Sequence, residues 1–272
     1  MAEFLTYQLK VAIALSVFYM FYRLLLSKET FHRVNRIVLL ATALLSFLLP
    51  FCVITLHDVV FIPAEAVANT GTAAAEVAEV AEGYSLWTII LSVLFFIGVA
   101  AVLANVLVSI ISIRKIMYKG SRHEMEGGID LIITEDKTAS FSWMKFIVIS
   151  SEDYRGGCSQ ILMHERAHIE LRHSWDLLFV DIITAVQWFN PAIWMLKGDL
   201  RMLHEFEADD AVLRSGVNMK EYQYLLIRKS LGGSGYSLVN NFNHSTLKQR
   251  ISMMLNKKSY FQSLQEFLSK VL

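Results

Sequence analysis

Two histidines four residues apart carry the first chemical signal in the chain. They are His164 and His168 in the stretch ILMHERAHIELRH, and Glu165 directly follows the first. On an α-helix, residues i and i+4 lie on one face, so both imidazoles can bind one metal ion. The HExxH spacing is typical of zinc hydrolases, in which the glutamate is the general base and not a ligand. We therefore predict one Zn²⁺ ion held by His164 and His168, with Glu165 as the catalytic residue.

A catalytic zinc ion usually takes a third protein ligand, and a second segment offers carboxylates for it. The segment GDLRMLHEFEADDAVL (residues 198–213) has a helical pattern of apolar residues, and its Glu205 and Asp209 are spaced i, i+4. Metal-bound histidines commonly donate their other ring N–H to a carboxylate, which fixes the tautomer. We predict Glu205 as the third ligand and Asp209 as the carboxylate behind it. Glu207, on the other side of that helix, is the alternative ligand.

Three further residues lie near the predicted ligands. His173 follows His168 by five positions, an offset that turns it off the metal-binding face. His204 adjoins Glu205 and Arg201 precedes it by one turn. Each of the latter two is a candidate donor to the oxyanion of the reaction, and Arg201 is equally a candidate ion-pair partner of Glu205.

Long apolar runs place these residues in a membrane protein. The chain has 272 residues, is 54% hydrophobic and has a mean hydropathy of +0.44, which does not fit an ordinary soluble domain. Three runs, at about 4–26, 37–56 and 86–113, are long enough for the ~20 helical residues that cross a bilayer core. We predict a mainly α-helical protein with a transmembrane region at residues 1–113 and a cytosolic, membrane-associated zinc metallopeptidase domain at 114–272.

The distribution of charge predicts the orientation. Lysine and arginine gather in residues 23–36 and 114–122, whereas 37–113 contains acidic residues as its only charged ones. By the positive-inside rule, both basic segments are cytoplasmic. The N-terminus and an outer loop at 57–85 then lie outside, and the metal site faces the cytosol. The amino end lacks the pattern of a cleavable signal, so the first run is expected to serve as its own anchor.

A fourth apolar stretch, residues 177–196, lies between the predicted ligands in the sequence. It cannot cross the membrane once, because the ligands must meet on one side. Pro191 lacks an N–H and disfavours a helical residue before it, so we predict two helical pieces, 177–189 and 191–197. They would form a re-entrant or interfacial hairpin. Asp176, just before the stretch, and Asp181, within it, support this, because isolated acids in such a run usually face a polar interior.

Upstream of the histidines, β-forming residues alternate around a polar turn. This pattern predicts a small β-hairpin with strands at about 129–134 and 145–150. Extended peptides can bind by adding a strand to the edge of such a sheet. We predict a substrate-binding edge strand that includes Ile147, Val148 and Ile149. The alternative is that these three residues form a plain core strand.

Taken together, these segments resemble the antirepressor membrane metallopeptidases typified by the β-lactam-responsive BlaR/MecR proteins. The motifs that carry the resemblance are ASFSWMKFIVIS, LMHERAHIELRHSWD, WFNPAIW, RMLHEFEADDAVL and LKQRISMM. The resemblance implies a gluzincin-like zinc endopeptidase of the HExxH…ExxxD pattern. Its zinc ligands map to His164, His168 and Glu205, and its base maps to Glu165.

The resemblance also implies a biological role and partners. Such a protein is expected in the bacterial inner (cytoplasmic) membrane, embedded in the lipid bilayer. An external signal, such as an antibiotic or cell-wall signal, leads it to cleave itself, a transcriptional repressor of the winged-helix class, or both. Direct binding to nucleic acid is not expected.

Two departures from the family pattern concern the signal. Family members usually have a fourth span that leads to an external sensor, and this sequence ends at Leu272, about where that span would begin. The chain is therefore expected either to be truncated or to act through a homo-oligomer or a partner sensor protein. The outer loop also lacks the SxxK pair of a penicillin-binding sensor, so direct β-lactam binding is not expected.

Two alternative functions stay open at this point. One is a housekeeping zinc protease for the quality control of membrane proteins. The other is a non-catalytic signalling scaffold with a structural zinc site.

Overall fold

The computed structural model describes residues 2–27, 29–52, 86–136, 139–232 and 239–255. Within these residues the helices are α1 (Ala2–Leu25), α2 (His32–Leu48), the short 3-10 helix η1 (Leu49–Phe51), α3 (Leu86–Lys119), α4 (Ser151–Arg155), α5 (Ser159–Glu170), α6 (His173–Val186), α7 (Pro191–Arg214), α8 (Met219–Gly232) and α9 (Val239–Leu255). The strands are β1 (Ser121–Met125), β2 (Ile129–Thr134), β3 (Phe141–Trp143) and β4 (Phe146–Ser150). The predicted mainly α-helical fold with a small sheet is confirmed.

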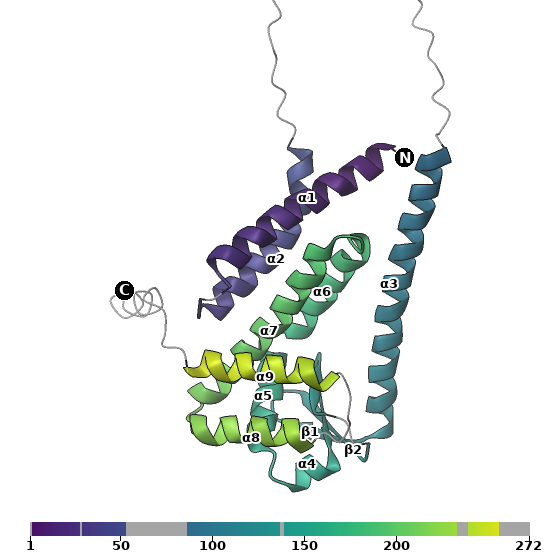
Figure 1. Ribbon diagram of the computed structural model, residues 1–272. Coiled ribbons are helices and arrows are strands. Elements are labelled where there is room, and N and C mark those ends of the chain that lie inside the picture. Colours follow the sequence, from purple (N-terminus) through teal and green to yellow (C-terminus); the bar gives the residue numbers. More distant parts are fainter. Residues whose placement is uncertain (1, 28, 53–85, 137–138, 233–238, 256–272) are drawn as a thin grey trace, which may run out of the picture.

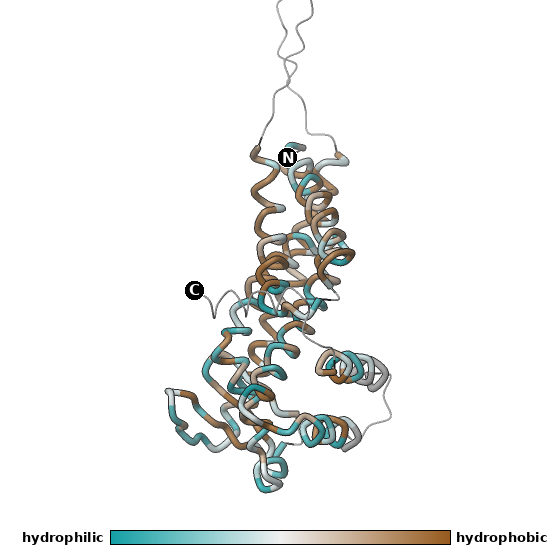
Figure 2. The backbone as a smooth tube through the Cα atoms, turned by 90° about the vertical axis from the view of Figure 1, so that its left-hand side faces the viewer, coloured by the Kyte–Doolittle hydropathy of each residue, from teal (hydrophilic) through white to brown (hydrophobic). Residues whose placement is uncertain are grey.

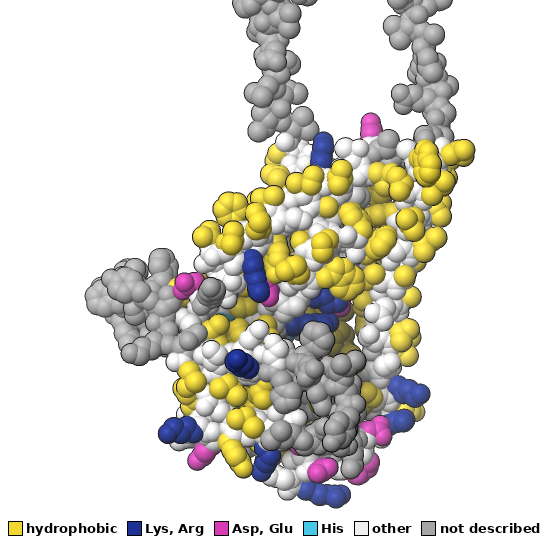
Figure 3. Space-filling view, viewed as in Figure 1, with side chains coloured by type: hydrophobic (Ala, Val, Ile, Leu, Met, Phe, Trp, Pro, Cys, Tyr) yellow, Lys and Arg dark blue, Asp and Glu magenta, His cyan; other side chains and the backbone are white. Residues whose placement is uncertain are grey.

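Three helices are long and apolar enough to cross a membrane. They are Glu3–Leu25, His32–Phe51 and Leu86–Lys119. The second begins at His32 rather than at 37, and the third continues to Lys119 rather than ending at 113. The predicted outer loop, 57–85, lies outside the described residues. Hydrophobic residues dominate these helices (Figure 2), and charged side chains gather mainly over the other end of the molecule (Figure 3).

Helices α6 and α7 form a hairpin that lies between the α1–α2 pair and α3 (Figure 1). Pro191 occupies the first turn of α7, and Asn190 before it is extended, with φ −91° and ψ 116°. The helix break is thus where the sequence predicts it, because proline disfavours a helical residue before it. The second piece does not end at 197, however, and α7 continues without interruption to Arg214.

Buried hydrogen bonds hold the turn of this hairpin between α1 and α3. Gln187 donates to Gln8 Oε1 at 2.7 Å, and the Trp188 indole N–H donates to the Phe95 carbonyl at 3.2 Å. Gly98 on α3 leaves room for that indole, because a Cβ atom there would overlap it. A buried polar group without a partner is costly, so these contacts favour one position of the hairpin along the flanking helices.

The sheet corrects the predicted β-hairpin. Strands β2 and β4 occupy almost the predicted ranges, but they pair in parallel. The sheet order is β1-β2-β4-β3, in which β1 folds back on β2 and β3 folds back on β4. The β1–β2 turn has Gly127 and Gly128 at positive φ, a conformation that glycine adopts without steric cost. The prediction missed β1, which is polar and exposed, and β3, which has three residues.

The predicted edge strand is also wrong. Strand β4 lies between β2 and β3, and Ile147, Val148 and Ile149 are fully buried. An almost continuous apolar run is typical of a strand that is covered on both faces. The alternative, a core strand, therefore describes these residues. The edge of the sheet that lies beside α5 is β3 (Phe141–Trp143).

The hydrophobic core has two parts, and helix α5, which carries His164 and His168, lies between them. One part joins α1 and α2 to the α6–α7 hairpin through residues such as Leu39 and Ile193. The other packs the sheet on α5 through residues such as Ile147 and Ile161. Helix α5 also packs along α7. It is therefore fixed between the sheet and the helix that carries the acidic residues.

Candidate metal centre

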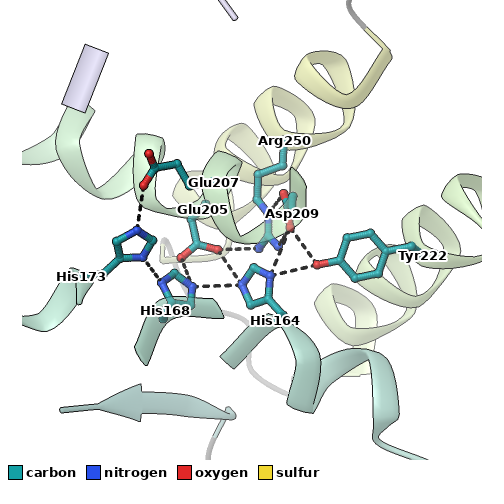
Figure 4. Close-up of polar contacts among 8 residues, drawn as sticks. All are labelled: His164, His168, His173, Glu205, Glu207, Asp209, Tyr222 and Arg250. Carbon is teal, nitrogen blue, oxygen red and sulfur yellow. Dashed lines mark hydrogen bonds and ion pairs between the residues drawn. The ribbon is translucent and has the colours of Figure 1, made fainter. Parts of the chain in front are cut away.

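Helices α5 and α7 bring His164, His168 and Glu205 together (Figure 4). The two Nε2 atoms lie 3.2 Å apart, and the Glu205 oxygens lie 3.4 Å from His164 Nε2 and 3.6 Å from His168 Nε2. Ligand atoms about 2.0–2.1 Å from a tetrahedral zinc ion lie roughly 3.3 Å from one another. Both the donor set and its spacing therefore fit a zinc ion.

Glu165 lies on α5 beside the ligands, and only 7% of its surface is exposed. Burial raises the pKa of its carboxyl group, which outweighs the opposing effects of His164 and the Ser142 hydroxyl. A general base is most effective when its pKa approaches the working pH. Glu165 is thus a buried carboxyl group with a raised pKa beside the candidate ligands.

The outer ring nitrogen of His164 faces Asp209 and Tyr222. His164 Nδ1 is 3.3 Å from Asp209 Oδ1 and 2.9 Å from the Tyr222 hydroxyl, which itself donates to Asp209 at 2.7 Å. A carboxylate in this place holds the ring with its proton on Nδ1 and leaves Nε2 free for a metal ion. Asp209, predicted behind Glu205, therefore lies behind His164.

Arg250 on α9 contacts both carboxylates. Its Nη1 lies 2.9 Å from Glu205 Oε2, and its Nε donates to Asp209 Oδ2 at 2.8 Å. Burial alone would raise the pKa of each carboxyl group, but hydrogen bonds with His164 and the charge of Arg250 lower both below their usual range. Sequence analysis did not single out Arg250 or Tyr222, because no local spacing connects either one to the ligands.

The two histidine ligands have opposite pKa shifts. Burial alone would lower the pKa of His164, but its hydrogen bonds to Asp209 and Glu205 raise it to about 9. Burial and the nearby charge of His164 lower the pKa of His168 to about 3. Ligating histidines must be neutral, so a metal ion would displace a proton from His164 but not from His168.

Behind His168 lies a third imidazole. His168 Nδ1 and His173 Nδ1 are 2.7 Å apart, and His173 Nε2 is 2.9 Å from Glu207 Oε2. The ligand group does not include His173, in line with its predicted offset from the metal-binding face. Glu207, the alternative ligand, instead contacts this outer imidazole.

His204 and Arg201 are not part of the candidate ligand group. His204 is buried, its Nε2 lies 3.0 Å from Asp176 Oδ2, and its ring stacks on that of His173 with the centroids 4.0 Å apart. Arg201 is exposed and forms no ion pair with Glu205. The structure therefore does not support their predicted roles as donors to the reacting oxyanion.

With this geometry established, the chain was compared with known proteins. The sequence model of the BlaR1 peptidase M56 family matches residues 4–254, which include all but the first residue of the three candidate spans and the whole metal centre. No curated protein matches the chain at a significant level. The family consists of peptidases, so the chain is a peptidase of the BlaR1 type. The resemblance drawn from the motifs is confirmed, and this chain belongs to the BlaR1 peptidase M56 family.

Proposed function

We propose that the chain is a zinc endopeptidase of the bacterial inner membrane that acts in signal transduction. The observation that carries the proposal is the convergence of two imidazole nitrogens and the Glu205 carboxylate beside the buried Glu165. A structural zinc site needs four ligands and no base. Three ligands with a buried carboxyl group at their side are what a hydrolytic site requires.

The residues of the centre would divide the work of peptide hydrolysis. His164, His168 and Glu205 would hold the ion, and zinc supplies Lewis-acid polarisation of the peptide carbonyl and activation of water. Glu165 accepts the proton of the attacking water and delivers it to the leaving nitrogen. Its raised pKa suits the first step, because a stronger base accepts the proton more readily.

The free edge of β3 is the proposed site for an extended substrate. This strand packs beside α5, and a hydrogen bond from its Ser142 side chain lowers the pKa of Glu165 against the effect of burial. An extended peptide can add to a sheet edge through main-chain hydrogen bonds, with side-chain pockets giving specificity. We therefore assign substrate binding to Phe141–Trp143 in place of Ile147, Val148 and Ile149.

The charge pattern supports the proposed orientation, and the family suggests the proposed partners. The basic segments 23–36 and 114–122 favour the cytosol for the inner ends of the spans, which puts the N-terminus outside and the metal centre inside. The proposed substrates are the chain itself and a winged-helix repressor, cleaved when an external signal arrives. A second copy or a partner sensor would deliver that signal within the bilayer.

The test compares new protein N-termini in cells that express the wild type, Glu165→Gln or the control Glu170→Gln. Glu170 is exposed on the same helix and pairs with Arg166, so its substitution should leave activity unchanged. We expect Glu165→Gln to reduce cleavage at least about 100-fold, because a general base contributes roughly 10²–10⁴. The zinc content of each purified protein should stay at one ion per chain.

The pattern of cuts separates the competing functions. Glu165-dependent cuts in the chain itself or in one repressor support the proposal. Glu165-dependent cuts in many unrelated membrane proteins favour a quality-control protease. If the wild type binds zinc but cells expressing it and cells expressing Glu165→Gln show the same cuts, the result would contradict peptidase function and favour a scaffold.

A further inference from the structure

Arg36 lies on a candidate membrane span, and its charged side chain forms contacts with the helices around the metal centre. It lies on α2, and its side chain is only 14% exposed. Its guanidinium group makes three hydrogen bonds. Nε donates to Asp176 at 2.6 Å, Nη1 to Glu207 at 3.0 Å, and Nη2 to the Leu171 carbonyl at 2.7 Å. One side chain thus joins α2 to α6, to α7 and to the turn that ends α5.

One of these contacts leads directly to a predicted metal ligand. Glu207, which accepts from Arg36, also accepts from His173 at 2.9 Å, and His173 contacts His168 at 2.7 Å. The proton positions agree along this path. A His168 ring that binds a metal ion through Nε2 carries its proton on Nδ1 and donates it to His173 Nδ1, whose Nε2–H then donates to Glu207.

A second contact of Arg36 holds the backbone that places His173. Only Leu171 and Arg172 connect α5 to α6, and Arg172 adopts the left-handed conformation, with φ 59° and ψ 34°. This conformation is costly for a residue with a Cβ atom, so it persists where surrounding contacts determine it. The bond from Arg36 satisfies the Leu171 carbonyl at the end of α5, where intrahelical partners run out.

We propose that Arg36 is a positioning residue for the metal ligand His168, so that the candidate span α2 forms the outermost support of the metal centre. The inference deepens the proposed function and rests on it, because it takes His168 as a zinc ligand. Displacement of α2 would withdraw the guanidinium from Glu207 and from the α5–α6 turn together. His173 would then lose its fixed orientation, and zinc would bind His168 less tightly. A movement of α2 is thereby a means of regulating the peptidase from within the membrane.

Arg23 offers a matched control for this proposal. It also lies on a candidate span and forms an ion pair with a carboxylate of α7, at 2.9 Å from Asp199. Its side chain is 53% exposed, and Asp199 accepts a further bond from Tyr19 rather than from a residue behind a ligand. Substitution of Arg23 therefore removes the same kind of charge, and an ion pair between another candidate span (α1) and α7, without touching the path to His168.

The experiment measures zinc affinity of the purified full-length protein in detergent, by competition with a chelator. We expect Arg36→Gln to lower the affinity about tenfold and His173→Phe about 10–100-fold, the range for residues that orient metal ligands. Arg23→Gln should leave it unchanged within about twofold, because exposed ion pairs contribute little. In the His173→Phe background, Arg36→Gln should cause little further loss, since both act along one path. If Arg36→Gln does not fold, Arg36→Lys replaces it in the experiment. Lysine keeps the positive charge but lacks the planar guanidinium group that makes the three hydrogen bonds.

Two results would overturn the proposal. One is equal zinc affinity in Arg36→Gln and Arg23→Gln. The other is a full, additive loss when Arg36→Gln is combined with His173→Phe, which would show general support of the fold rather than positioning of His168. Failure of the proposed function would appear in a different experiment. A wild type that binds zinc but makes no Glu165-dependent cut would contradict the proposed function. The zinc affinities of the Arg36 and Arg23 variants could still be measured and compared.

Discussion

The two candidate histidine ligands, His164 and His168, differ in the side chains that support their rings on the side away from the centre. His164 is supported by charged and polar side chains from the C-terminal helices: Asp209, Tyr222 and Arg250. His168 is supported first by a neutral ring and then by an ion pair that includes a membrane-span residue: His173, Glu207 and Arg36. One ligand therefore depends on α7, α8 and α9, and the other depends on α6, α7 and α2.

This difference explains the opposite pKa shifts of the two rings. An anion beside His164 stabilises its charged form, whereas His168 is buried against another imidazole and next to a charged one. The C-terminal helices thus place charged groups beside His164, whereas α6 and α2 place a neutral ring and an ion pair behind His168. Substitutions on the two sides should consequently have different signatures.

The largest effect is expected on the His164 side, from Asp209→Ala. The substitution leaves Arg250 without its bidentate partner, and breaking a buried ion pair costs about 3–5 kcal/mol of the free energy of unfolding. Zinc affinity should also fall about 10–100-fold because His164 loses its orienting carboxylate. Denaturant unfolding and chelator competition in detergent measure the two effects. Asp210→Ala is the control, since this half-buried neighbour forms an ion pair with Arg214 on the same helix, and the change should stay within about 0.5 kcal/mol.

The pH dependence of stability should separate the two rings in protein stripped of zinc by a chelator. The folded pKa of His164, about 9, lies above its ordinary value of 6.5, so its contribution is full below pH 6.5 and is lost as the pH rises toward 9. The folded pKa of His168, about 3, lies below 6.5, so its contribution is full above pH 6.5 and is lost as the pH falls toward 3. Stability from this pair should therefore peak near pH 6.5.

Thermal unfolding at a series of pH values tests this profile. Asp209→Asn should flatten the alkaline side more than the acid side, because it removes one of the two carboxylates that raise the pKa of His164. Equal flattening of both sides would contradict the separation between the two supports.

The smallest effect is expected from Tyr222→Phe. Asp209 still contacts His164 and still accepts from Arg250, so only one buried hydroxyl group is lost. The expected cost is about 0.5–1.5 kcal/mol in unfolding free energy, with less than a tenfold loss of zinc affinity. Tyr224→Phe, at an exposed position of the same helix, should change neither quantity. A loss in Tyr222→Phe as large as that of Asp209→Ala would mean that the hydroxyl orients His164 more than the carboxylate does.

Local patterns were sufficient for the parts of the protein that depend on neighbours in sequence. The pairing of His164 with His168 follows from helical periodicity, and the break at Pro191 follows from the proline ring. The positions of β2 and β4 followed from their β-branched residues, but the pattern gave the wrong pairing, because parallel partners require a connection that no local signal specifies.

Contacts between distant segments decided the rest. The structure places Glu205 rather than Glu207 beside the histidines, because α7 continues unbroken from the hairpin and presents one of its faces to α5. Arg36 lies 140 positions from Asp176 and 171 from Glu207, so its sequence neighbours identify it only as one of several basic residues next to a span. Helical spacing could therefore predict the candidate metal-binding pair, whereas the packing of distant helices determined which side chains lie behind each of the two rings.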